Sequence, residues 1–374
     1  VSKARRKQRS IFGVLVGICV VSALAVFWFR SNAVKQSRVS SSVQDMNSAT
    51  SATEVLDGLS KKGVFEVSVH QIENELKPLD NVLIHRPDDV PKGILFVGHG
   101  CSHSHTDFFP PTPGVCPRCL GLPEERAIVK MAWEDFGFIV MAMSSKNRNS
   151  KCWAPPDETR VAQVLRDIKR QYPGLDLPVI AFGASSGGWF VGRSLYPAIL
   201  DLQVRFDGYI STISAPNPLP HTDDFRAIPV GVYITMSRDE HTEQNALDVI
   251  KLLHDREVPA KHISIPPQPI TEGFFNSRIP EISMEQSRKL YKALMNAGYL
   301  DPSTNLLNED PRESAWRDVL RPLVPSTTDS FVADESAISE VMNVAFGRHE
   351  MSRDGVKEAI EWILEEFPKR PPRG

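Results

Sequence analysis

Several motifs that mark cofactor-dependent and nucleic-acid-binding proteins are missing from this sequence. It has no phosphate-binding loop, no dinucleotide fingerprint, no nucleic-acid-binding module and no acidic metal-ligand motif, so no cofactor of these kinds is expected. Asn-x-Ser/Thr sites are also absent, so glycosylation gives no indication of the compartment. No internal repeat is visible either.

Acidic residues are missing from the first 44 positions, although these positions carry eight Lys and Arg residues. The net charge of −3 for the whole chain therefore hides an asymmetry, because the remaining residues carry 35 basic and 46 acidic side chains. A domain with a net charge of −11 is a poor candidate for binding nucleic acid, so we expect no nucleic-acid partner.

An uncharged run from Ile11 to Phe29 follows the basic tail of residues 1–10. As a helix it would span about 28 Å, close to the thickness of a bilayer core. Five basic residues precede the run and three follow it, so the amino terminus is expected to remain cytoplasmic. The sequence thus predicts a single-pass signal anchor that carries a luminal or extracellular domain.

Two alternatives for this segment lead to a secreted or an organellar protein. Ala23-Leu-Ala25 resembles the small-residue site at which a signal peptide is cleaved. The late first acid, Asp45, is compatible with an organelle transit peptide. Residues 30–61 are rich in Ser, Ala and Thr without periodicity, which predicts a flexible stalk.

From residue 62 to residue 374, short β-branched runs alternate with helical stretches, which favours an α/β domain with a mostly parallel, eight-stranded sheet and helices on both faces. Strands are predicted near Phe65–His70, Val82–His85, Ile94–Gly98, Phe138–Met143, Val179–Phe182, Gly208–Ile213, Val230–Met236 and His262–Ile265. Amphipathic helices are predicted near Pro123–Glu134, Asp157–Gln171, Trp189–Ile199 and Thr242–Asp255. In the second of these helices, Asp157 and Arg160 fit a solvated outer face.

The sequence Gly183-Ala-Ser-Ser-Gly187 fits G-x-S-x-G and lies between a predicted strand and a predicted helix. This pattern is a nucleophile elbow when it joins a strand to a helix, because small neighbours allow a strained turn that exposes the serine hydroxyl. Ser185 is the predicted nucleophile, since a glycine stands two positions before it, directly after the strand. Ser186 is the rival nucleophile.

Three strands come first, strand–helix alternation follows, and the elbow comes after the fifth strand, which is the plan of an α/β-hydrolase. Over residues 63–374 the chain resembles a plant-type group of α/β-hydrolases. The motifs that carry the resemblance are Gly100-Cys101, Cys116-Pro-Arg-Cys119, Gly121-Leu-Pro-Glu-Glu125, Lys151-Cys-Trp153, Gly183-Ala-Ser-Ser-Gly-Gly188 and Ala345-Phe-Gly-Arg-His-Glu-Met351. The resemblance implies a serine hydrolase and gives no substrate.

In this fold the catalytic residues follow one another as Ser, Asp or Glu, and His. Asp239 lies just past the strand Val230–Met236 and is the predicted acid, with Glu240 as the alternative. His349 is the predicted base because it follows the last strand and precedes a final amphipathic helix. His262, at the start of the last predicted strand, is the rival base.

Backbone N–H groups are expected to stabilise the oxyanion of the reaction. One belongs to Ser186, which follows the nucleophile. The other is expected from the loop after the third strand, where Gly100 and Cys101 are the natural donor positions. His99 is interpreted as a residue that shapes this loop.

Four cysteines lie outside the apolar run: Cys101, Cys116, Cys119 and Cys152. Two disulfides are expected if the domain is luminal. A structural zinc site, with His103 or His105 as further ligands, and four free thiols are the alternatives. In each case the cluster would brace the oxyanion loop.

Residues 274–341 form a long insertion between the last strand and His349, and we expect it to act as a cap over the site. Its aromatic residues Phe274, Phe275 and Trp316 fit core positions better than pocket positions. The whole sequence thus predicts a membrane-anchored serine hydrolase for a small or lipid-like acyl substrate, most simply a carboxylic ester. A non-catalytic binding or scaffold protein with the same fold is the alternative.

Overall fold

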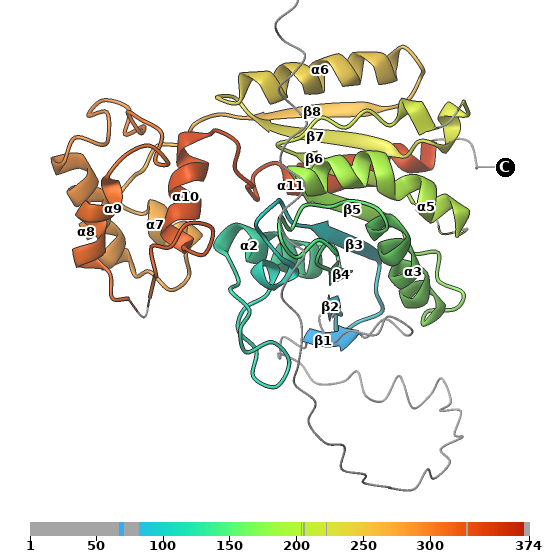
Figure 1. Cartoon of the computed structure of the whole chain (residues 1–374), viewed down its shortest axis with the longest axis horizontal. Coiled ribbons are helices and arrows are strands. Elements are labelled where there is room, and N and C mark those ends of the chain that lie inside the picture. The colour runs from blue at the N-terminus through green and yellow to red at the C-terminus, as the bar shows by residue number, and fades with distance from the viewer. Residues whose placement is uncertain are drawn as a thin grey trace, which may run out of the picture. The chain divides into compact units, whose positions relative to one another are not determined.

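The computed structural model describes residues 67–70, 82–202, 204, 206–221, 223–326 and 328–369 (Figure 1). All of them belong to one compact unit, Thr53–Gly374. The predicted basic tail, apolar run and stalk lie outside the described residues. Within the described part of the chain, no helix combines the length and the apolar character that a membrane span needs.

One eight-stranded sheet forms the centre of this unit, with the strand order β1-β2-β4-β3-β5-β6-β7-β8. Strand β2 is antiparallel to both of its neighbours, and the pairs from β4 to β8 are parallel. This order confirms the predicted α/β-hydrolase fold. The strands are β1 Val67–His70, β2 Val82–His85, β3 Gly93–Gly98, β4 Phe138–Ala142, β5 Val179–Ala184, β6 Gly208–Thr212, β7 Val230–Met236 and β8 Ala260–Ile265.

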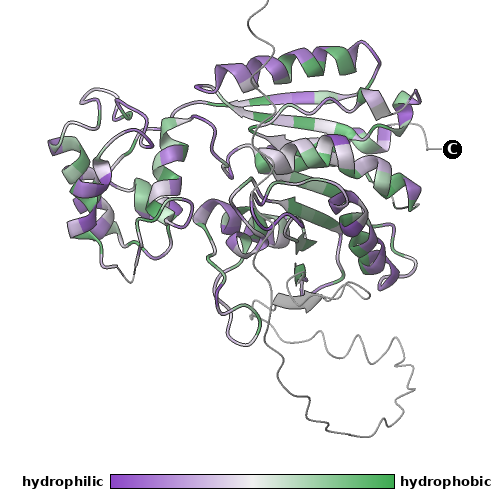
Figure 2. Cartoon of the chain, in the orientation of Figure 1, coloured by the Kyte–Doolittle hydropathy of each residue, from purple (hydrophilic) through white to green (hydrophobic). Residues whose placement is uncertain are grey.

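Helices cover both faces of the sheet, because its central strands are buried on both sides and read as continuous apolar runs. Figure 2 shows these apolar runs in the strands, with hydrophilic residues along the covering helices. One face packs against α3 (Asp157–Arg170), η2 (Phe190–Leu195), α5 (Tyr196–Asp201) and α6 (Glu240–His254). The other face packs against α2 (Pro123–Glu134) and α11 (Val356–Glu366).

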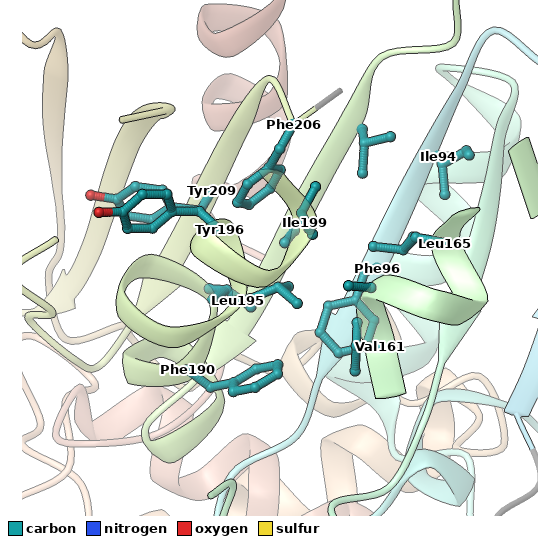
Figure 3. Packing of buried hydrophobic residues seen from close by; sticks show 14 of the residues in the cluster. Ile94, Phe96, Val161, Leu165, Phe190, Leu195, Tyr196, Ile199, Phe206 and Tyr209 are labelled. Atoms are coloured by element: carbon teal, nitrogen blue, oxygen red, sulfur yellow. The ribbon is translucent and has the colours of Figure 1, made fainter. Parts of the chain in front are cut away.

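Figure 3 shows the first of these cores at the centre of the sheet. Phe96 of β3 lies edge-on to Phe190 of η2, with ring centroids 6.3 Å apart. Phe190 stacks in turn on Trp153, at 4.5 Å. This packing fixes the helical segment that follows the elbow against the strand that precedes the oxyanion loop.

The helical segment that follows Ser185 begins three residues earlier than predicted from the sequence. It was predicted from Trp189, but α4 spans Ser186–Trp189 and continues directly into η2 and α5. Glycines at positions 187 and 188 have low helix propensity, which hides this first turn from a propensity argument. A Cβ at Gly187 would lie 2.6 Å from the carbonyl oxygens of Gly98 and His99, so close packing requires glycine there.

The interpretation of Asp157 and Arg160 as a solvated face is wrong. Asp157 is 0% exposed and Arg160 is 4% exposed, and their side chains form an ion pair of 2.7 Å. Asp157 also accepts the N–H groups of Lys146 and Ala154. The first turn of α3 therefore lies beneath the loop that follows β4, and its charges organise that loop.

The insertion after β8 contains α7 (Phe274–Arg278), α8 (Met284–Asn296), α9 (Trp316–Leu320) and α10 (Ala337–Phe346). These helices enclose a hydrophobic cluster of their own, in which the rings of Phe274, Phe275 and Trp316 are buried as predicted. Arg278 of α7 joins the cluster to the hydrolase core, because its guanidinium binds Glu124 of α2 at 2.8 Å and Asp354 at 2.6 Å.

Candidate active site

Ser185 lies in a sharp turn between β5 and α4, and its backbone φ of 51° is positive. Residues with a side chain adopt this conformation only where the surrounding structure holds it. The Ser185 N–H donates to the carbonyl of Thr212 on the neighbouring strand at 2.9 Å. The strand–turn–helix geometry of a nucleophile elbow is therefore present.

Ser185, His349 and Asp239 form one hydrogen-bonded chain, although they are far apart in the sequence. His349 Nε2 lies 3.4 Å from Ser185 Oγ, and His349 Nδ1 lies 2.6 Å from Asp239 Oδ2. An ionised carboxylate can only accept a hydrogen bond, so Asp239 assigns the imidazole proton to Nδ1. Nε2 is then free to accept the proton of the serine hydroxyl.

Asp239 has two roles in the fold, because it is also the N-cap of α6. Its Oδ1 accepts the N–H of Thr242 at 3.4 Å, while Oδ2 faces His349. Burial by itself would raise the pKa of Asp239, but the hydrogen bonds from His349 and Thr242 outweigh burial and hold it below its ordinary value. Asp239 is therefore ionised at neutral pH.

The rival residues have other surroundings in the structure. Among the described residues, the Ser186 hydroxyl is buried and has no hydrogen-bond partner. Glu240 is exposed at the start of α6. His262 bonds to Thr235 Oγ1 at 2.8 Å and faces Glu243, so it belongs to the β7–β8 edge.

The loop after β3 lies against the elbow. A Cβ built on Gly100 would lie 3.8 Å from Ser185 Cβ and 3.7 Å from the Ala184 carbonyl, so Gly100 brings the backbone close to the serine. No hydrogen bond from the N–H of Gly100 or of Cys101 to another described group is present. Gly100 and Cys101, which were predicted as oxyanion donors, therefore lie in a loop that contacts the turn carrying Ser185 and Ser186.

All four cysteines of the domain form disulfides, in the pairs Cys101–Cys152 and Cys116–Cys119. The first of them joins the loop that follows β3 to the loop that follows β4. Next to it, the Trp153 indole donates to the carbonyl of His99 at 2.8 Å. In the described part of the chain, no group of three or more His, Cys, Asp or Glu side chains is arranged to hold a metal ion.

Three histidines of the oxyanion loop differ in charge. Burial lowers the pKa of both His99 and His105 to about 4, so both are neutral at pH 7. His99 has the loop-shaping position expected of it, since its Nε2 accepts the N–H of Ser145 at 3.2 Å. Burial would also lower the pKa of His103, but its hydrogen bond to Asp107 and the nearby carboxylates raise it to about 9. His103 is therefore cationic.

The His103–Asp107 pair was not predicted from the sequence. Asp107 is 2% exposed, lies 3.0 Å from His103 Nδ1 and accepts the N–H of Ser104. The only sequence feature that could have indicated this pair is a histidine four residues before an aspartate, and this spacing is common by chance. The two side chains form an ion pair without net charge, and it holds the His103 imidazole beside the loop that carries Gly100 and Cys101.

No protein-family model matches the sequence, and no curated protein matches it. Among solved structures, the chain is similar to an arylesterase, with 12% identity, coverage of 57% of this chain and 82% of that one, and a TM-score of 0.37. An esterase from the archaeon Pyrobaculum calidifontis has 15% identity, coverage of 57% and 80%, and a TM-score of 0.39. A thermostable carboxyl esterase from Bacillus coagulans, in complex with glycerol, has 16% identity, coverage of 55% and 91%, and a TM-score of 0.36.

These similarities are too distant to say more about the chain than its own geometry does. The observed topology has a mixed sheet with β2 antiparallel, and a serine elbow follows β5. A carboxylate follows β7, and a histidine follows the last strand. The order and direction of its eight strands identify the chain as a protein with the α/β-hydrolase fold.

Proposed function

We propose that this protein is a serine hydrolase that cleaves an ester, a thioester or an amide through an acyl-enzyme, with a carboxylic ester as the simplest substrate. The observation that carries the proposal is the hydrogen-bonded chain from Ser185 through His349 to Asp239. The 3.4 Å between Ser185 and His349 is long for a hydrogen bond, as catalytic contacts often are before substrate binds.

In the first step, Ser185 Oγ attacks the substrate carbonyl carbon while its proton moves to His349 Nε2. Asp239 stabilises the imidazolium that forms and keeps its proton-bearing Nδ1 in place. The carbonyl oxygen becomes an oxyanion. The backbone N–H groups of Ser186 and of Gly100 or Cys101 donate hydrogen bonds to it.

In the second step, the tetrahedral intermediate collapses, and His349 gives its proton to the departing alcohol, thiol or amine. A water molecule then loses a proton to His349 Nε2 and attacks the acyl-enzyme carbonyl carbon. The acid is released, and Ser185 recovers its proton. Every proton transfer uses the same imidazole nitrogen, so no further acid or base is needed.

We also propose that the hydrolase domain is held at a membrane by the segment Ile11–Phe29 and lies in a luminal or extracellular compartment. The two disulfides support an oxidising compartment, since such bonds are rare in reducing ones. A membrane location would favour a lipid-like acyl substrate, and the insertion of residues 274–341 would cap the site. The quoted motifs further suggest the plant-type group of α/β-hydrolases.

The decisive test is labelling of the purified full-length chain with a fluorophosphonate, which reacts with activated serines. We expect one adduct per chain, mapped by mass spectrometry to Ser185. Ser185→Ala is expected to abolish labelling, while Ser186→Ala is the matched control and should label normally. An adduct on Ser186 would contradict the assignment. A folded protein without any adduct would favour the non-catalytic scaffold.

A further inference from the structure

The turn that carries His349 is held in a demanding conformation. His349 lies between α10 and α11, its side chain is 50% exposed, and its φ is 42°. Few residues other than glycine adopt a positive φ, and those that do persist only where surrounding contacts hold them. Contacts with the backbone of this turn would therefore help to hold its conformation.

Arg312, in the insertion between α8 and α9, makes such contacts. Its Nη1 donates to the carbonyl of Arg348 at 3.0 Å, and its Nη2 donates to the carbonyl of His349 at 3.0 Å. Nη2 also donates to Glu350 Oε2 at 3.0 Å. One guanidinium thus binds three consecutive residues, with the imidazole-bearing residue in the middle.

Both ends of this contact are held in place. The carboxylate of Asp310 accepts a hydrogen bond from the backbone N–H of Arg312 at 2.9 Å. It also lies 3.4 Å from the guanidinium of Arg348. On the other side, the Asn343 amide of α10 donates to Glu350 Oε2 at 2.8 Å, which orients the carboxylate that Arg312 binds. The contact is therefore part of an ordered network.

A guanidinium suits this geometry better than any other side chain. Its planar fork presents several N–H donors in fixed directions, whereas a lysine ammonium presents three donors from a single atom. Arg312 divides its contacts between two nitrogens, because Nη1 bonds the Arg348 carbonyl while Nη2 bonds the His349 carbonyl and the Glu350 carboxylate. The site therefore selects arginine.

We propose that Arg312 is a positioning residue that holds His349 at hydrogen-bonding distance from Ser185, so that the insertion supplies part of the active site. The proposal rests on the proposed hydrolase function. Arg312 touches the backbone of His349 and not the reacting atoms, so its loss should affect the chemical step more than substrate binding.

The test compares Arg312→Ala and Arg312→Lys with the wild type in hydrolysis of a p-nitrophenyl ester by the full-length chain. We expect kcat to fall about 100-fold in Arg312→Ala, because a misplacement of about 1 Å has such an effect, while KM changes less than about 3-fold. Arg312→Lys should lie between the two, and added guanidinium should restore part of the activity of Arg312→Ala alone.

Arg317→Ala is the matched control. This arginine lies in the same insertion and bonds to Ser339 Oγ and to the carbonyl of Pro311, which precedes Arg312, so its loss disturbs the insertion near Arg312 without removing any contact to residues 348–350. Its kcat should stay within about 3-fold of the wild type, as expected for a residue outside the site. Wild-type kcat in Arg312→Ala, or an equal loss in both variants, would overturn the proposal. If Arg312→Ala does not fold, the same comparison is made with Arg312→Lys.

A second measurement does not depend on activity. The proton shared by His349 Nδ1 and Asp239 should give a low-field proton NMR signal, identified by its loss in His349→Gln. This signal should weaken or vanish in Arg312→Ala and persist in Arg317→Ala. An inactive wild type with this pattern would refute the hydrolase and leave the positioning role standing. An active wild type with an unchanged signal in Arg312→Ala would refute the positioning role alone.

Discussion

The disulfide between Cys101 and Cys152 should contribute to both stability and catalysis. Its cysteines are 51 residues apart, whereas Cys116 and Cys119 are three residues apart. In the chain-entropy account, a cross-link stabilises more when it closes a longer loop. For these separations the account gives about 4 kcal/mol for the first bond and about 2 kcal/mol for the second. The double variants Cys101→Ser/Cys152→Ser and Cys116→Ser/Cys119→Ser are therefore a matched pair.

The first bond should also affect turnover, because Cys101 is a candidate oxyanion donor and the neighbouring Trp153 donates to His99. Complete loss of one oxyanion donor typically costs about 100- to 1000-fold in kcat. Releasing the loop should misplace the donor without removing it, so we expect kcat to fall about 10-fold in Cys101→Ser/Cys152→Ser. The second bond closes a turn of three residues and joins no second loop to Cys101, so its loss should leave kcat within about 2-fold.

The free energy of unfolding is measured by guanidinium chloride denaturation without reductant, followed by tryptophan fluorescence. Turnover is measured at a temperature at which both variants remain folded. The two variants should differ by about 2 kcal/mol in unfolding free energy, with Cys101→Ser/Cys152→Ser less stable. Equal destabilisation of the two variants, together with equal kcat, would refute the reasoning on both counts.

Three further predictions concern the buried charges and the amino-terminal segment. Asp157→Ala should cost about 3–5 kcal/mol of unfolding free energy by breaking the buried pair with Arg160. Asp167→Ala in the same helix, where the side chain is 34% exposed and pairs only with the exposed Arg170, should cost less than about 0.5 kcal/mol, and equal losses would contradict this. Burial raises the pKa of Glu125 to about 7 and that of adjoining Glu340 well above its ordinary value, so both carboxyls take up protons on folding. Stability should therefore be full below the ordinary glutamate pKa and fall as the pH rises through 7, and Glu340→Gln should flatten this fall in a thermal unfolding series. A protease added outside sealed microsomes should spare the hydrolase domain unless detergent is present, and digestion without detergent would count against the luminal location.

Much of the fold could be predicted from the sequence, because the information is local. The strands Val82–His85 and Val230–Met236 have the predicted boundaries, since continuous apolar runs are typical of buried strands and little else of that length. The helix Pro123–Glu134 was also predicted correctly, with proline at its first position. The elbow around Ser185 could be predicted because its small residues are needed by the turn itself.

The remaining features depend on tertiary packing, which also buries residues that are close together in the chain, and no local pattern records that. The charges of Asp157 and Arg160 look solvated on a helical wheel, and only the loop packed over the first turn of α3 makes them a buried pair. The Cys101–Cys152 bond likewise follows from the distance between two loops that are far apart in the sequence. The His103–Asp107 pair and Arg312 have no sequence signature, since each depends on side-chain directions or on carbonyl groups that exist only in the folded backbone. Sequence alone indicated most of the elements and the likeness of the site to that of a serine hydrolase. Burial, charge state and the support of His349 were decided by tertiary packing, because they depend on which segments pack over each residue.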